Sequence, residues 1–117
     1  MNKQTGVKYD QDKIRMDLLP VGPLKELAKT YTIGSKKYGD LNYLGGMSWS
    51  KIYGAMLRHL VAWIDGEQID PENEQHHLAA VAWGAFTLME YEKLFPELDN
   101  RPLHKYKEIL DEKIPNK

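Results

Sequence analysis

Hydrophobic positions recur along most of the chain at the spacing of amphipathic helices. The pattern predicts a first helix from about Val21 to Tyr38, with Pro23 in its first turn, where a missing N–H costs nothing. A second helix is predicted to follow Ser48 as N-cap and to end at Gly66. Its inward positions are predicted to be Ile52, Met56, Leu57, Leu60, Val61 and Trp63.

The segment from Glu74 to Leu94 predicts a third helix that is apolar around most of its circumference. Such a helix lies either at the centre of a fold or in a subunit interface. Pro102 is predicted to start a last amphipathic helix that ends near Lys113. No alternating strand pattern of useful length is present, so the fold class expected is all-α with four helices.

Residues 1–20 lack this periodicity and predict an extended arm before a helical core over residues 21–113. Four apolar residues of the arm are candidates for docking on that core: Tyr9, Met16, Leu18 and Leu19. At 117 residues the chain is expected to form a single domain with a real core, and self-association would help so small a domain.

Composition narrows the function classes. The net charge of -1 gives no basic footprint, which argues against duplex nucleic acid as the main partner. The chain has no cysteine, which excludes disulfides, thiolate metal sites and cysteine nucleophiles. No apolar run approaches a membrane span, and the first residues are too polar for a secretory signal, so a cytoplasmic protein without membrane contact is predicted.

Candidate chemistry gathers where the second helix leads into the third. Arg58 and His59 come late in the second helix, Glu67 and Asp70 fill the connection, and His77 opens the third helix. Two helices joined this tightly are expected to pack antiparallel, which brings these groups to one end of the pair. Carboxylates and imidazoles together suit a hard or borderline divalent cation, which would in turn hold a phosphate. Glu26 is a further candidate ligand, from the first helix.

Each candidate also has a simpler interpretation. His59 is equally compatible with a hydrogen-bonded core or interface histidine. Arg58 pairs more often with a nearby carboxylate than with a substrate, and the acidic connection is also typical of a solvated turn. Glu26 could equally lie on the surface. His76 and His77 point in different directions on a helix, so at most one is expected to face a shared site, and we favour His77.

A second group of candidates lies at the end of the first helix and in the glycine-rich loop after it. Lys36 or Lys37 is predicted to contact phosphate oxygens, although lysines in a last helical turn are also ordinary partners of the helix dipole. Four loop-region residues are predicted to line a substrate pocket: Tyr38, Asp40, Asn42 and Tyr43. The three tryptophans, Trp49, Trp63 and Trp83, are expected to be core or interface anchors rather than stacking platforms.

Several blocks in a fixed order resemble a known family. They are Lys8-Tyr9-Asp10, Lys13-Ile14-Arg15-Met16-Asp17-Leu18-Leu19-Pro20, Lys36-Lys37-Tyr38-Gly39-Asp40-Leu41-Asn42-Tyr43, Gly46-Met47-Ser48-Trp49, Arg58-His59-Leu60, Gly66-Glu67, Asp70-Pro71-Glu72 and His77-Leu78-Ala79. From about Val7 to Leu94 the chain resembles the phage dATP/dGTP diphosphohydrolase family, N-terminal type. That resemblance implies a MazG-like, all-α, four-helix bundle and phage origin, hence the host cytoplasm. It also implies cleavage of a nucleoside triphosphate between its α and β phosphates.

The chain departs from the MazG-like pattern where the chemistry would occur. The paired acidic motifs of that pattern, Glu-x-x-Glu and Glu-x-x-Asp on adjacent helices, are missing, and Glu67-x-x-Asp70 falls in a turn. Where the family pattern leads us to expect a second histidine and an asparagine, this chain has Ala80 and Gly84. Two hypotheses therefore stand: an enzyme, or a phage protein that sequesters a signalling or defence nucleotide without turnover. A purely structural module is a third and weaker hypothesis.

In the enzymatic hypothesis, a divalent cation bound to Glu67, Asp70 and His77, with Glu26 as a further ligand, activates a water that attacks phosphorus, and His59 belongs to the catalytic set. Mg²⁺ is the first choice, with Mn²⁺ and Co²⁺ as alternatives. Arg58 and Lys37 would offset the charge on the leaving phosphates. The substrate expected is a purine nucleotide. The apolar third helix predicts a homo-oligomer, either a dimer or a tetramer.

Overall fold

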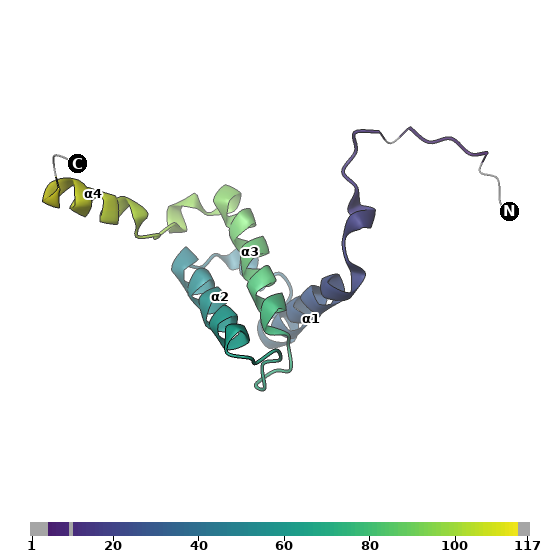
Figure 1. Cartoon of the computed structure of the whole chain (residues 1–117), viewed down its shortest axis with the longest axis horizontal. Helices are drawn as coiled ribbons and strands as arrows, with labels where there is room; N and C mark the ends of the chain where they lie inside the picture. Colours follow the sequence, from purple (N-terminus) through teal and green to yellow (C-terminus); the bar gives the residue numbers. More distant parts are fainter. Residues whose placement is uncertain (1–4, 10, 115–117) are drawn as a thin grey trace.

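The computed structural model describes residues 5–9 and 11–114, so residues 1–4 and 10 of the predicted arm lie outside the described residues. The main helices are α1 (Val21–Tyr38), α2 (Trp49–Ile64), α3 (His77–Leu94) and α4 (Leu103–Lys113) (Figure 1). Short 3₁₀ turns cover Met16–Leu18, Asn42–Gly45 and Pro96–Leu98. Within the described ranges there is no strand, only an isolated bridge between Ile69 and His76. The all-α prediction is confirmed.

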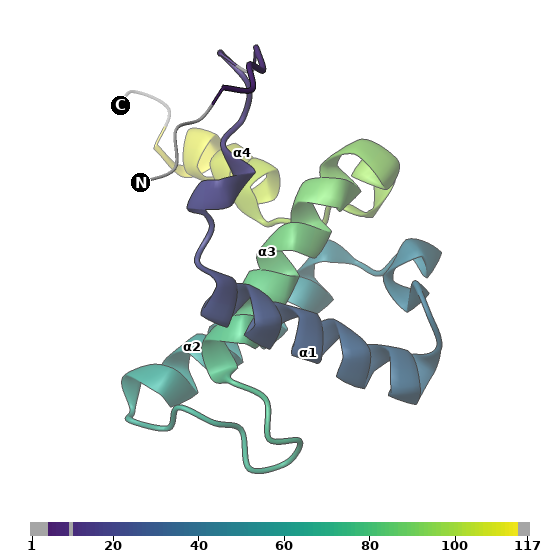
Figure 2. The ribbon, with the colours of Figure 1, turned by 90° about the vertical axis from the view of Figure 1, so that its right-hand side faces the viewer.

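Helix α3 is the centre of the packed part of the molecule. Helix α2 lies beside α3 and runs in the opposite direction, and α1 crosses α3 on another side (Figures 1 and 2). A helix that contacts neighbours on two sides must be apolar around most of its surface. Of the two positions predicted for the third helix, the structure shows the central one. Its contacts with neighbours on two sides explain why its sequence has no single apolar stripe.

The arm and α4 do not belong to this packed core. Figure 1 shows them extending away from α1–α3 in opposite directions. The radius of gyration is 20.0 Å, whereas a compact chain of this length has about 13 Å. The expected four-helix bundle is thus a three-helix core with a separate α4, because Pro96 ends α3 and the link after it carries α4 outward. Tyr9, Met16, Leu18 and Leu19 are all exposed, so the predicted docking of these residues on the core is wrong.

The core forms where α2 meets the end of α3. Trp49, Ile52 and Tyr91 are buried there, and the Trp49 indole N–H donates to the carbonyl of Phe95 at 3.1 Å. The guanidinium of Arg101 lies 4.8 Å from the centre of the Trp49 ring. These contacts hold the segment after α3 against the start of α2, as expected for a tryptophan that serves as a core anchor.

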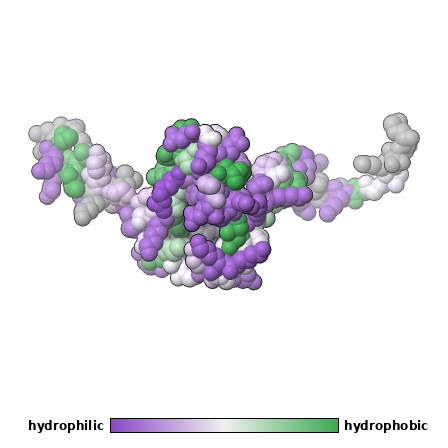
Figure 3. Space-filling view, turned by 90° about the horizontal axis from the view of Figure 1, so that it is seen from below, coloured by the Kyte–Doolittle hydropathy of each residue, from purple (hydrophilic) through white to green (hydrophobic). Residues whose placement is uncertain are grey.

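The residues of α2 that are buried differ from the inward stripe that the sequence predicts. Ile52 is buried and Met56 half-buried against α3, but Leu57, Val61 and Trp63 are exposed. The helical period explains the difference, because positions four apart share a face and positions 57 and 61 lie on another face from 52 and 56. On the face seen in Figure 3, hydrophobic residues form separate patches between hydrophilic ones. A homo-oligomer that covers these residues stays a prediction.

The amino end of α2 is capped by a residue from the other end of the domain. Ser48 precedes the helix as predicted, but its side chain makes no capping hydrogen bond. Instead, Asn100 Oδ1 accepts the backbone N–H of Ser50 at 2.9 Å, and Asn100 Nδ2 donates to Ser50 Oγ at 2.7 Å. The cap therefore ties the link before α4 to the start of α2.

Replacing Asn100 with Ala is expected to lower the free energy of unfolding by about 1 kcal/mol, because the first turn of α2 loses its acceptor. Asn100→Asp is the matched control, since it keeps a side-chain oxygen and adds a charge that suits a helix N-terminus. Urea unfolding followed by circular dichroism measures both variants. Equal stability of Asn100→Ala and the natural protein would show that this cap contributes nothing.

The end of α2 and the start of α3 determine the conformation of the connecting loop, residues 65–76. Gly66 has φ +102°, and the N–H groups of Gly66 and Glu67 donate to the carbonyls of Trp63 and Ala62, both at 3.0 Å. This is a Schellman motif, as the glycine predicts. Helix α3 starts at His77 rather than at Glu74, because Glu74 has φ +61° and cannot continue a helix. No helix in the described part of the chain is long and apolar enough to span a bilayer.

Candidate functional site

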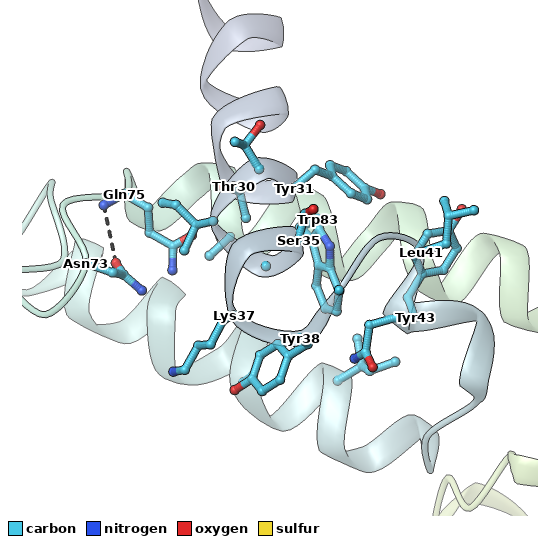
Figure 4. Close-up of a pocket in the computed structure, with 18 of the residues that line it drawn as sticks. Thr30, Tyr31, Ser35, Lys37, Tyr38, Leu41, Tyr43, Asn73, Gln75 and Trp83 are labelled. Atoms are coloured by element: carbon cyan, nitrogen blue, oxygen red, sulfur yellow. Dashed lines mark hydrogen bonds between the residues drawn. The ribbon is translucent and has the colours of Figure 1, made fainter.

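A pocket of about 1020 Å³ opens between α1, the loop after it, α2, α3 and the connecting loop (Figure 4). We call it the α1–α3 pocket. Its polar lining includes Thr30, Ser35, Lys37, Asp40, Asn42, His59, Asn73 and Gln75, and its aromatic lining consists of Tyr31, Tyr38, Tyr43 and Trp83. Mostly apolar walls with a few placed polar groups are typical of sites for small organic ligands.

Two histidines from neighbouring helices meet at the edge of this pocket. The Nδ1 atoms of His59 on α2 and His77 on α3 lie 2.9 Å apart, and His77 Nε2 lies 2.7 Å from Glu67 Oε1. His77 is only 4 % exposed. A carboxylate can only accept, so His77 Nε2–H donates to Glu67, and the short distance between the two Nδ1 atoms means that one of them donates its proton to the other. The result is a chain of three side chains, from half-exposed Glu67 to His59 at the pocket.

Local structure explains why these side chains meet. The Schellman motif turns the chain so that Glu67 follows α2 directly, and the N–H of His77 donates to the carbonyl of Gln68 at 3.0 Å. His76 faces elsewhere, and its Nδ1 accepts the N–H of Leu78 at 3.0 Å as the cap of α3. Of the two adjacent histidines, the structure places His77 beside His59, as the sequence predicts.

Asp70 completes the group from within the connecting loop. Its backbone N–H donates to the carbonyl of Gln75 at 2.8 Å, its carbonyl accepts the N–H of Glu74 at 2.8 Å, and its Oδ1 accepts the N–H of Glu72 at 2.9 Å. These bonds fix the position of the carboxylate. One candidate ligand atom from each of His59, Asp70 and His77 lies within 4.8 Å of the others. We call these three residues the histidine site.

The electrostatics of the histidine site favour a neutral His59. Burial lowers the pKa of His59 from its ordinary value, and the neighbouring His77 lowers it further, while Asp70 acts in the opposite direction. A neutral imidazole is the form that binds a metal ion. His59 is therefore held in the protonation state that ligation needs.

The donor set fits a divalent cation. Two imidazole nitrogens at about 2.0–2.1 Å from one ion lie about 3.3 Å apart in tetrahedral geometry and about 2.9 Å apart at a right angle, and the Nδ1 atoms of His59 and His77 lie 2.9 Å apart. A histidine that ligates a metal usually donates its other ring N–H to a carboxylate, which is the bond His77 makes to Glu67. Two imidazoles and one carboxylate suit a first-row transition ion better than the all-oxygen sites that Mg²⁺ prefers.

Three predicted residues are not among the three grouped ligands of the histidine site. Glu67 contacts His77 and is not one of the three grouped ligands. Glu26 is exposed on α1 and does not line the α1–α3 pocket. Arg58 is exposed, and its Nη1 lies back over Gly54, 3.7 Å from where a Cβ would stand, outside the pocket lining. The roles predicted for Glu26 and Arg58 require a rearrangement that this structure does not include.

Most of the second predicted group lines the α1–α3 pocket. Lys37, Tyr38, Asp40 and Asn42 are lining residues, whereas Lys36 is exposed outside it. Ser35 Oγ donates to Asp40 Oδ1, and Gly39 at φ +92° lets the chain turn sharply after α1. The α1–α3 pocket therefore brings residues of the second group together with His59, which links the pocket to the histidine site.

Other pocket residues escaped prediction. Trp83 packs against the core, as expected for an anchor, and its ring also lies beside that of Tyr31 at the pocket wall, with centres 6.2 Å apart. Burial raises the pKa of Tyr31, which keeps its hydroxyl protonated. Asn73 and Gln75 also line the pocket, although nothing in an acidic turn marks a neutral amide as functional. The sequence could not single out Trp83 as a pocket residue, because it lies among the apolar residues that cover most of α3.

The two departures from the family pattern have different surroundings. Ala80 is buried and lines the pocket. Gly84 is buried against Met56, and a Cβ built on it would lie 2.2 Å from Met56 Cγ. Position 84 is thus where Met56 of α2 packs directly on the backbone of α3, and an asparagine there would have to displace Met56. The glycine has a packing reason that is independent of any lost ligand.

Comparisons with known proteins agree with the resemblance. Residues 3–101 match the model of the family described as dATP/dGTP diphosphohydrolase, N-terminal. A Salmonella phage PMBT28 protein named dATP/dGTP diphosphohydrolase is 32 % identical over 98 residues, which cover 84 % of this chain but only 31 % of that relative. No solved structure matches significantly. The family model covers most of the sequence, including α1–α3 and the histidine site, and the chain therefore belongs to the dATP/dGTP diphosphohydrolase N-terminal family.

Proposed function

We propose that this protein hydrolyses purine deoxynucleoside triphosphates to the monophosphate and pyrophosphate, with a divalent cation at the histidine site. The observation that carries the proposal is the grouping of His59, Asp70 and His77 at an aromatic-lined pocket of nucleotide size. The name of the phage relative supports the substrate class, although that protein is about three times as long as the matched region.

Each side chain of the site would have its own role in the proposed reaction. His59, Asp70 and His77 would hold the cation, and Glu67 would fix the ring of His77 through the 2.7 Å bond. When bound, a divalent cation lowers the pKa of a water molecule and offsets phosphate charge. Lys37, in the pocket wall, would contact the phosphates. The rings of Tyr31, Tyr43 and Trp83 offer the base an apolar, stacking surface.

The donor set shifts the choice of metal. Mg²⁺ was the first expectation from the sequence, but two imidazoles among three donors favour a later first-row transition ion, so Co²⁺ suits the site better than Mg²⁺ or Mn²⁺. Gly84 also weakens the hypothesis of a binder without turnover, because its packing against Met56 explains it without a lost ligand.

A metal-dependence assay tests the proposal. The purified protein is freed of metal with a chelator, mixed with dATP or dGTP, and supplied in turn with Mg²⁺, Mn²⁺ or Co²⁺ while pyrophosphate release is followed. We expect no release without metal, and the fastest release with Co²⁺. Equal turnover before and after chelation would remove the metal from the proposal.

The role of Glu67 can be tested separately from turnover. Glu67→Ala is expected to weaken Co²⁺ binding about 10–100-fold, because His77 loses the acceptor that orients it. Glu67→Gln should lose less, since its amide oxygen can still accept from Nε2–H. Glu72→Ala, an exposed change in the same loop, is the control. Calorimetric titration with Co²⁺ gives the affinities, and unchanged binding by Glu67→Ala would argue that its carboxylate does not position His77.

A further inference from the structure

We infer that Gln75 binds the triphosphate of the substrate, and that the α1–α3 pocket takes its ligand with the phosphates toward the connecting loop and the base toward Tyr43. This inference rests on the proposed function. It adds a substrate-binding residue that neither the sequence patterns nor the family match assigns, and it orients the ligand in the pocket.

Gln75 is a buried polar side chain that the protein leaves unused. It is only 8 % exposed and lines the α1–α3 pocket. Its backbone is fully engaged, because its N–H donates to Asn73 Oδ1 at 3.3 Å and its carbonyl accepts from Asp70. Among the described residues, no hydrogen bond is made to its side-chain amide, and no side-chain polar atom is sealed from solvent without a partner. The amide therefore faces the pocket space, where a ligand can reach it.

The backbone before Gln75 is strained in a way that fixes this placement. Glu74 has φ +61°, a left-handed conformation that costs a residue other than glycine about 1–2 kcal/mol. The N–H of Glu74 donates to the carbonyl of Asp70, and its own carbonyl accepts from Lys29 Nζ at 3.4 Å. Strain of this kind persists where the surrounding bonds hold it, and it concentrates at ligand sites. Here it turns the chain so that Gln75 lines the pocket.

The pocket has two chemically different ends. Figure 4 shows Asn73 and Gln75 together at one end and Leu41 and Tyr43 at the other, with Lys37 between them along the near wall. The backbone hydrogen bond from the N–H of Asp70 to the carbonyl of Gln75 places this end of the pocket next to Asp70 of the histidine site. A cation held there attracts phosphate oxygens, so the phosphates belong at this end, and the apolar, aromatic end is left for the base.

The chemistry of the amide suits a phosphate chain. The side-chain NH₂ of Gln75 carries two donors, and the non-bridging oxygens of a triphosphate accept only. A lysine or arginine at position 75 would compete with the cation for the carboxylate of Asp70. The neutral amide donates to the phosphate oxygens without this competition. Replacing the amide by a carboxylate of the same shape would instead place a negative charge against the phosphates.

Binding measurements test this orientation without turnover. Inorganic tripolyphosphate, which has no base or sugar, and a dGTP analogue with a methylene bridge between the α and β phosphates are titrated calorimetrically with Mn²⁺ present. Gln75→Met is expected to weaken both ligands about tenfold or more, as the loss of a hydrogen bond to a charged group requires. Gln75→Glu should weaken both further. Gln68→Met, an exposed change in the same loop, should bind like the natural protein.

The outcomes separate this inference from the proposed function. If the natural protein binds neither ligand, the proposed function fails together with the inference. If it binds both, a loss in Gln75→Met confined to the dGTP analogue would place the amide against the nucleoside and overturn the inference, as would no loss at all. If Gln75→Met folds poorly, nuclear magnetic resonance of the natural protein supplies the test. The protein has four glutamines, and all are labelled with ¹⁵N. Tripolyphosphate must then shift the Gln75 amide signal, and an unchanged signal overturns the inference.

Discussion

Asp70→Asn is expected to reduce metal-stimulated hydrolysis of dATP and dGTP by at least about 100-fold, since loss of partners that only orient ligands already costs 10–100-fold. Asp70 supplies the only carboxylate among the three grouped ligands of the histidine site. Asparagine keeps the side-chain oxygen that accepts the N–H of Glu72, so the turn should survive while the charge is lost. Asp70→Ala removes the charge and the turn bond together, and should abolish hydrolysis completely.

The control for Asp70→Asn is a carboxylate that lies close to the histidine site but outside it. Glu72 is exposed in the same loop, and Glu72→Gln removes the same charge from almost the same place. We expect this variant to keep its turnover. Initial rates at saturating Mn²⁺, with Co²⁺ affinity measured in parallel, distinguish a lost ligand from a misfolded loop. Unchanged turnover in Asp70→Asn would remove Asp70 from the mechanism.

Gly84→Ala is expected to lower the free energy of unfolding by about 1–3 kcal/mol, the usual range for overpacking a tight core. The added Cβ would meet Met56 Cγ at 2.2 Å and Sδ at 2.5 Å, so the side chain of Met56 must move or the helices must separate. Alanine favours a helix over glycine by up to about 1 kcal/mol, and the clash has to exceed that gain. Gly84→Asn, which restores the residue expected from the family pattern, should be more destabilising.

A double variant shows whether this contact is the cause. Shortening Met56 to Ala costs stability by itself, but Gly84→Ala should then become neutral or stabilising, because the clashing atoms are gone. Thermal unfolding of the four proteins completes the cycle. An equal cost of Gly84→Ala with and without Met56 would mean that the close approach of α2 and α3 does not restrict position 84. Gly34→Ala is the control, since nothing lies within 4 Å of its Cβ position.

Local sequence signals predicted the helices well where they had local causes. The bounds of α1 match the prediction, since Pro23 favours the first turn and Gly39, with its left-handed backbone, stops the helix. The end of α2 follows from Gly66. The start of α3 and the cap of α2 were wrong in detail, because Glu74 and Asn100 act through bonds that only the folded chain creates.

Sequence spacing also brought His59, Asp70 and His77 together, because a short connection between two helices leaves few arrangements. It could not show that Glu67 contacts His77, or that Gln75 has an unused amide, since both depend on the conformation of the connecting loop. Nor could it separate α4 from the core. An amphipathic pattern shows that a helix has an apolar face, and it does not show what covers that face.

Product analysis by ion-pair chromatography is the most direct measurement of the proposed activity. A panel of ribo- and deoxyribonucleoside triphosphates and cyclic nucleotides is incubated with the pure protein and Mg²⁺, Mn²⁺ or Co²⁺, and analysed before and after heat denaturation of the protein. The structure and the family lead us to expect dAMP or dGMP together with pyrophosphate. A nucleotide that leaves the solution and returns unaltered after denaturation would contradict hydrolysis and identify a binding protein.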